Sequence, residues 1–178
     1  MFCTVLHHLK SPENVGILIR THVALGGAQV VVVGPEPWRP KDRAQAFSRR
    51  LERLCEFVHC IDDDAFFSWC RSNNVVPIAI EIATPPTWLP GYSFPERTAL
   101  VIGHESRGIA PDVLARCAGV VTIPQHGPVA CLNVAVSGAM AMYELVRGRA
   151  ASREIGGDEY VVEAHEKRTA DTASRLVR

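Results

Sequence analysis

The 178-residue sequence lacks the short motifs by which the commonest cofactor and metal sites are recognised. It contains neither the GxGxxG pattern of dinucleotide-binding proteins nor the GxxxxGK(S/T) phosphate-binding loop, so both classes are without support. Its six cysteines form no CxxC pair and no Cys/His cluster at zinc-ligand spacing. The N-terminus shows no basic-then-apolar export signal. We therefore expect a reduced, cytoplasmic protein.

Neither sign of charge is in excess, because 19 lysines and arginines balance 19 aspartates and glutamates. A nucleic-acid partner would thus have to be met by a local basic patch rather than by overall attraction. The longest apolar run, residues 129–146, is about as long as a membrane span but contains Asn133 and Glu144. This run favours a buried helix over a membrane helix, and we expect no membrane partner.

Short apolar runs bounded by glycine, proline or polar residues predict strands that are buried on both faces. They lie at residues 4–6, 30–33, 75–80, 99–102 and 120–123. Apolar residues recur at helical spacing between them, at residues 15–25, 44–57, 64–73 and 111–118. The alternation predicts an α/β fold with helices on both faces of a mostly parallel sheet. We expect one domain over residues 1–149 and a charged tail over residues 150–178 that is helical or partly disordered.

Three of the predicted strands end at Ile80, Ile102 and Ile123, and open parallel sheets bind ligands outside such carboxyl ends. The loop after Ile102 reads G-x-E-x-x-G from Gly103 to Gly108. Its glycines would let the backbone approach a ligand closely. Taken alone, however, this pattern favours a plain turn from strand to helix.

Polar residues near these loops each have an ordinary structural explanation. Asn133 precedes a run of helix formers and could be a helix N-cap, whereas Glu105 could be a solvated loop residue. Asn14 could cap the first helix, and Arg20 projects from it. A guanidinium can hold phosphate oxygens through two parallel hydrogen bonds. An ion pair on the helix surface is nevertheless the simpler explanation of Arg20 by itself.

Three motifs taken in order resemble those of the SpoU/TrmH family, S-adenosylmethionine-dependent RNA ribose 2′-O-methyltransferases of the SPOUT class. They are N-x-G-x-x-x-R at residues 14–20, G-x-E-x-x-G at 103–108, and I-P followed by L-N-V and Y-E within 123–144. The resemblance covers about residues 3–148. It implies an S-adenosylmethionine cofactor, a C-terminal trefoil knot, a homodimer and no metal.

The resemblance also implies roles for individual residues. Those matching the catalytic positions are Arg20, Asn14, Glu105 and Asn133. Arg20 would hold the target phosphate near the knot of the partner, since a guanidinium is a poor general base. The residues that match the cofactor-binding positions are Ile80, Gly103, Ile123, Cys131 and Leu132.

One departure from the family pattern bears on activity. Family members commonly read S-L-N-V-S where this chain has Cys131, Leu132, Asn133, Val134 and Ala135. A cysteine can keep a backbone contact but offers only a weak hydrogen-bond donor. Cofactor binding would survive this change better than a step that needs the serine hydroxyl.

The segment 38–53 is rich in basic residues and could contact RNA, in particular through Arg39, Lys41, Arg43, Arg49 and Arg50. An equally good interpretation is a solvated helix face with Phe47, Leu51 and Leu54 turned inward.

The leading hypothesis is an RNA 2′-O-methyltransferase that acts on tRNA or rRNA. One alternative is a catalytically weak or inactive SPOUT-fold RNA-binding dimer, which Cys131 and Ala135 would favour. Another is methyl transfer to a base nitrogen, against which the N-x-G-x-x-x-R motif argues.

Overall fold

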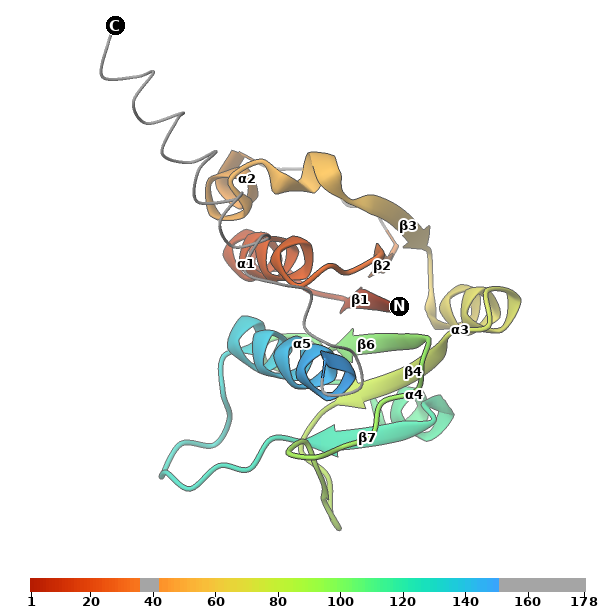
Figure 1. Cartoon of the computed structure of the whole chain (residues 1–178), viewed down its shortest axis with the longest axis vertical. Coiled ribbons are helices and arrows are strands. Elements are labelled where there is room, and N and C mark those ends of the chain that lie inside the picture. The colour runs from red at the N-terminus through yellow and green to blue at the C-terminus, as the bar shows by residue number, and fades with distance from the viewer. Residues whose placement is uncertain (36–41, 151–178) are drawn as a thin grey trace, which may run out of the picture. The chain divides into compact units, whose positions relative to one another are not determined.

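The computed structural model describes residues 1–35 and 42–150 and contains a seven-stranded sheet (Figure 1). The strands are β1 (Phe2–His7), β2 (Gln29–Val33), β3 (Glu56–Cys60), β4 (Val76–Ile80), β5 (Thr87–Trp88), β6 (Thr98–Ile102) and β7 (Gly119–Thr122). All neighbouring strands are parallel, in the order β3-β2-β1-β6-β4-β7-β5. The mostly parallel sheet predicted from the sequence is confirmed.

Helices cover both faces of this sheet, as Figure 1 shows. They are α1 (Pro12–Ala24), α2 (Asp42–Ser48), α3 (Asp63–Ser72), α4 (Pro111–Arg116) and α5 (Val134–Ala150), with a short 3₁₀ helix at Leu51–Leu54. One core contains Leu18 of α1 and Met142 of α5, and the other contains Phe66 of α3 and Val113 of α4. The α/β fold class is therefore confirmed, whereas the C-terminal trefoil knot stays a prediction.

Strand β6 shows why the central strands have continuous apolar sequences. All five of its residues are buried, and they face the two cores alternately: Leu100 and Ile102 face one, Ala99 and Val101 the other. A strand with helices on both faces has no solvated side and therefore no polar alternation. In the register of the sheet Ile80 pairs with Ile102, and Ile123 directly follows β7. The three predicted strand ends thus do lie at one edge of the sheet.

The single helix expected over residues 44–57 is wrong. Helix α2 ends at Ser48, Arg49 and Arg50 have left-handed backbone angles with φ of 54° and 60°, and β3 begins at Glu56. This turn breaks the helical spacing on which the inward placement of Phe47 and Leu54 rested. Both side chains are exposed instead, by 41% and 73%.

Two other expectations are modified. The apolar run of residues 129–146 is helical only from Val134 onward. No helix within residues 1–35 and 42–150 is long and apolar enough to cross a membrane.

Met1–Gly148 form one structural unit. Most of the predicted tail, residues 151–178, lies outside the described part of the chain.

Gly16 generates a prediction about stability. A Cβ atom added there would lie 2.5 Å from the carbonyl oxygen of Ala44 and 2.7 Å from Cβ of Phe47. Backbone cannot move aside as a flexible side chain can, so Gly16→Ala should lower the free energy of unfolding by about 1–3 kcal/mol in urea titrations. Gly148→Ala is the matched control, because nothing lies within 4 Å of its added Cβ. It should cause no loss, and an equal loss in both variants would contradict this account of the packing between α1 and α2.

Candidate functional site

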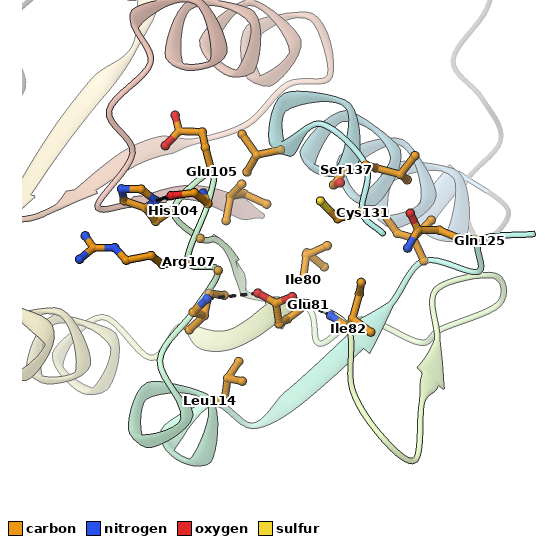
Figure 2. A pocket seen from close by; sticks show the side chains of 18 residues that line it. Ile80, Glu81, Ile82, His104, Glu105, Arg107, Leu114, Gln125, Cys131 and Ser137 are labelled. Carbon is orange, nitrogen blue, oxygen red and sulfur yellow. Dashed lines mark hydrogen bonds between the residues drawn. The ribbon is translucent and has the colours of Figure 1, made fainter. Parts of the chain in front are cut away.

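A cavity of about 430 Å³ lies at the carboxyl edge of β4, β6 and β7 (Figure 2). Its walls come from the segments that follow these strands and from the first turn of α5. All five residues predicted to contact a cofactor line it: Ile80, Gly103, Ile123, Cys131 and Leu132. The structure therefore brings these residues together, although their role in binding stays a prediction.

The loop from Gly103 to Gly108 folds back on itself to form one wall of the cavity. The backbone N–H of Gly108 donates to the carbonyl of His104 at 2.9 Å, and His104 N–H donates to the carbonyl of Gly108 at 3.2 Å. A Cβ atom on Gly103 would lie 2.5 Å from Ile109 Cγ1, and Gly108 has φ of 63°. Both glycines are therefore required by the shape of this turn.

Glu105 is not a solvated loop residue. Its carboxylate accepts hydrogen bonds from the backbone N–H groups of Ser11 at 2.8 Å and Lys10 at 3.2 Å, and from Nδ2 of Asn14 at 3.3 Å. Burial of the carboxylate opposes ionisation, but these hydrogen bonds, led by that of Ser11, lower the pKa of Glu105 overall. Glu105 thus holds the segment before α1 against the glycine loop.

Asn14 and Asn133 continue this network into α5. Nδ2 of Asn133 donates to Oδ1 of Asn14 at 3.1 Å, while Oδ1 of Asn133 accepts from the backbone N–H groups of Ala135 at 2.9 Å and Val136 at 3.3 Å. The expected N-cap role of Asn133 is therefore confirmed. Hydrogen bonds join Glu105, Asn14 and Asn133, one residue from each of the three sequence motifs. The expectation that Asn14 caps the first helix is wrong, because Ser11 is the N-cap of α1 and its hydroxyl accepts from the backbone N–H of Asn14.

Glu81 is a cavity residue that sequence reasoning missed. Its Oε2 accepts from Ile109 N–H at 3.1 Å and its Oε1 from Ile82 N–H at 2.8 Å (Figure 2). A Cβ atom on Gly108 would collide with Oε2 of Glu81, so this glycine also makes room for the carboxylate. Glu81 directly follows β4 at the carboxyl edge, and that position was the signal that could have found it.

Two buried polar atoms of the cavity residues have no hydrogen-bond partner within the described part of the chain. They are Nε2 of His104 and Oε1 of Gln125. Buried polar groups usually have partners, and a bound ligand could supply them here. Apolar side chains, backbone groups and unpaired polar atoms together fit a cofactor with a flat heterocycle and polar substituents.

Cys131 lacks the hydroxyl of the usual serine, but another residue of the cavity carries a hydroxyl. Ser137 lines the same cavity, and its Oγ donates to the carbonyl of Asn133 at 3.1 Å. Cys131 is exposed at the cavity, whereas Ala135 is fully buried in the core. A side chain at position 135 therefore faces the core rather than the cavity.

Arg20 does not line the cavity of its own chain. It is exposed on α1 and lines a second hollow together with Arg49, Phe47 and Tyr143. The other basic residues predicted to contact RNA have different environments where the structure describes them. Arg43 forms an ion pair with Glu13, and Arg50 is exposed. Arg39 and Lys41 lie outside the described residues.

The fold is an α/β fold with a cavity at the carboxyl edge of a parallel sheet, the place where open parallel sheets commonly bind ligands. The model of the SpoU rRNA Methylase family matches residues 1–143. This match spans well over half of the chain, and the chain belongs to the SpoU rRNA Methylase family.

Individual relatives agree with this assignment. The chain is 30% identical over 141 residues to tRNA (guanosine(18)-2′-O)-methyltransferase TARBP1 of Mus musculus, covering 78% of this chain and 9% of that protein. It is 28% identical over 155 residues to 23S rRNA (guanosine-2′-O-)-methyltransferase RlmB of Acinetobacter baylyi, covering 81% and 58%. The chain thus spans less than two thirds of the length of either relative.

A solved structure shows the same fold. The SpoU methyltransferase AviRb from Streptomyces viridochromogenes, in complex with the cofactor AdoMet, superimposes with a TM-score of 0.76 at 22% identity. The likeness covers 85% of this chain and 61% of AviRb.

The hydrogen bond between Asn14 and Glu105 generates a pH prediction. Asn14→Asp would replace the donor amide by a second carboxylate next to Glu105, and like charges raise the pKa of at least one of them. The folded protein would then bind more protons than the unfolded chain at weakly acidic pH, so its stability should fall as pH rises. We expect a loss of about 2–3 kcal/mol in the free energy of unfolding at pH 8 and a smaller loss at pH 5.

Urea titrations at both pH values measure this difference. Asn74→Asp is the matched control, because it makes the same change of amide to carboxylate at an exposed position. It should show little dependence on pH. A loss in Asn14→Asp that is independent of pH would contradict the proximity of the two side chains.

Proposed function

We propose that this chain is a cytoplasmic RNA 2′-O-methyltransferase that uses S-adenosylmethionine and acts on a ribose of tRNA or rRNA. The observation that carries the proposal is the hydrogen-bonded set of Glu105, Asn14 and Asn133, which joins the three family motifs beside the cavity. The names of the mouse and bacterial relatives support the reaction, since both are guanosine 2′-O-methyltransferases.

The cavity residues would hold S-adenosylmethionine in this proposal. Ile80, Ile123 and Leu132 offer apolar surface, and Gly103 leaves the backbone accessible to a ligand. Nε2 of His104 and Oε1 of Gln125 would receive the hydrogen bonds that they lack. The cofactor supplies an electrophilic methyl group on a sulfonium, and alignment of the ribose hydroxyl with it would provide much of the acceleration.

Glu105, Asn14 and Asn133 act in this proposal by positioning the loops. The Glu105 carboxylate is already bonded to three N–H donors, and its lowered pKa makes it a weak proton acceptor. Arg20 would hold the RNA phosphate next to the reacting ribose through its guanidinium. These assignments need no metal.

A homodimer is part of the proposal because Arg20 does not line the cavity of its own chain. Around Arg20, Ile17, Phe47 and Tyr143 expose 38%, 41% and 60% of their surface. An apolar patch with an arginine within it is typical of a protein interface. A second copy packed there would bring Arg20 toward the cavity of its partner.

Cys131, which lines the cavity in place of the usual serine, favours a second candidate function, a catalytically inactive RNA-binding dimer. Calorimetric titration with S-adenosylmethionine distinguishes the two functions. Binding at micromolar concentration supports the enzyme, and no detectable binding supports the inactive dimer.

Arg20→Ala tests the catalytic assignment. We expect transfer of labelled methyl from S-adenosylmethionine to bulk tRNA or rRNA to fall by a factor on the order of 10²–10³. Cofactor affinity should remain nearly unchanged. Arg71→Ala is the matched control, because Arg71 is an exposed arginine on α3, against the opposite face of the sheet.

Nucleoside mass spectrometry of the modified RNA identifies the product. A 2′-O-methylated nucleoside is the expected result, and a methylated base would assign the chain to a different reaction. Unchanged turnover of Arg20→Ala would remove Arg20 from the catalytic set.

Subunit complementation tests the dimer. Arg20→Ala keeps the cavity, and Cys131→Trp fills the cavity but keeps Arg20. Co-expression at equal amounts yields mixed dimers in half of the molecules, each with one complete site. We therefore expect about a quarter of wild-type activity. Activity no greater than that of the two variants alone would show that Arg20 does not act across the interface.

A further inference from the structure

We propose that His7, His8 and Asp63 form a binding site for a divalent transition metal, with Zn²⁺ as the ion that the ligands suit. His7 ends β1, His8 follows it, and Asp63 is the first residue of α3. The site lies at the carboxyl ends of β1 and β3, in the half of the sheet edge that the cavity does not use. It is separate from the proposed methyl transfer.

The three ligand atoms already lie close to one another. Nε2 of His7 is 2.7 Å and Nε2 of His8 is 3.7 Å from Oδ1 of Asp63. All three atoms lie within 4.8 Å of each other. Ligands in a tetrahedral zinc site with bonds of about 2.0–2.1 Å are about 3.3 Å apart. Small movements of the two half-buried side chains, His8 and Asp63, would produce this spacing.

The surrounding backbone holds the two imidazoles in place. His7 is only 3% exposed, and its ring packs edge to face against that of His8 with centroids 4.5 Å apart. His8 has φ of 57°, an uncommon conformation for a residue with a side chain, and its N–H donates to the carbonyl of Val33 at 3.0 Å. Such a conformation persists only where neighbouring structure maintains it.

The chemistry of the three groups favours zinc over calcium or magnesium. Two imidazole nitrogens and one carboxylate are borderline donors, whereas the harder cations prefer oxygen alone. Three protein ligands leave a fourth position for water. The two flanking carboxylates have other partners: Asp62 caps α3, and Asp64 forms an ion pair with Arg116.

Metal binding would stiffen the segment before α1, whose N–H groups hold Glu105. Lys10 and Ser11, whose N–H groups hold the Glu105 carboxylate, follow His8 by two and three residues. A metal that joins His8 to α3 would fix the beginning of this segment.

Calorimetric titration of the tag-free 178-residue chain with Zn²⁺ tests the proposal. One equivalent should bind, and Zn²⁺ should raise the melting temperature of the wild type. Asp63→Asn should weaken binding at least tenfold, because an amide is a poor zinc ligand. His8→Asn should do the same while keeping a residue that tolerates the left-handed backbone. His59→Asn is the matched control, since His59 is an exposed histidine on β3 of the same sheet.

Substitution with Co²⁺ distinguishes the possible ligands. Strong visible absorption typical of a four-coordinate nitrogen and oxygen site supports the proposal. A thiolate charge-transfer band in the near ultraviolet would assign the metal to cysteine and overturn it. Two results would overturn the proposal: equal Zn²⁺ affinity of the wild type and both ligand variants, or no binding of Zn²⁺ to the folded wild type. His7 and Asp63 would then form only a hydrogen-bonded pair. Circular dichroism confirms that each variant is folded, and the proposal still rests on Asp63→Asn if His8→Asn is not.

Discussion

The arrangement of the site depends on the two hydrogen bonds of the Asn14 side-chain amide. The amide bonds to Glu105, 91 residues away, and to Asn133, 119 residues away. Asn14 is 8% exposed, so an unpaired amide at this position would cost free energy. The orientation of every group in the network is determined. A carboxylate can only accept, which turns Nδ2 of Asn14 toward Glu105 and leaves its Oδ1 for Asn133. Oδ1 of Asn133 is then free to cap α5.

This directionality explains how ordinary structural roles and functional roles coincide. One chain of hydrogen bonds has three structural effects. It caps α5, it fixes the segment before α1, and it positions the glycine loop. Each residue taken alone has a sufficient structural explanation. Only their connection, which spans three distant segments, indicates a common site. Such networks specify a unique arrangement when every member is satisfied.

Sequence patterns predicted the central strands well, because burial on both faces leaves an unbroken apolar run. They failed at residues 44–57, where left-handed angles at Arg49 and Arg50 interrupt a spacing that looked continuous. β5 has two residues and is too short to give a pattern. The family motifs located the cavity residues, yet Glu81 stands outside these motifs. The position of Arg20 away from the cavity also could not be predicted, because it depends on packing between α1 and α2.

The register of the strand ends has an evolutionary consequence. Ile80, Ile102 and Ile123 belong to the hydrophobic core and also form the floor of the cavity. Selection for ligand shape and selection for folding therefore act on the same methyl groups. A lineage that reshaped this floor for another ligand would have to compensate elsewhere in the core. The polar lining residues Gln125 and Ser137 do not belong to the hydrophobic core and are free of that constraint, so divergence in specificity should accumulate there first.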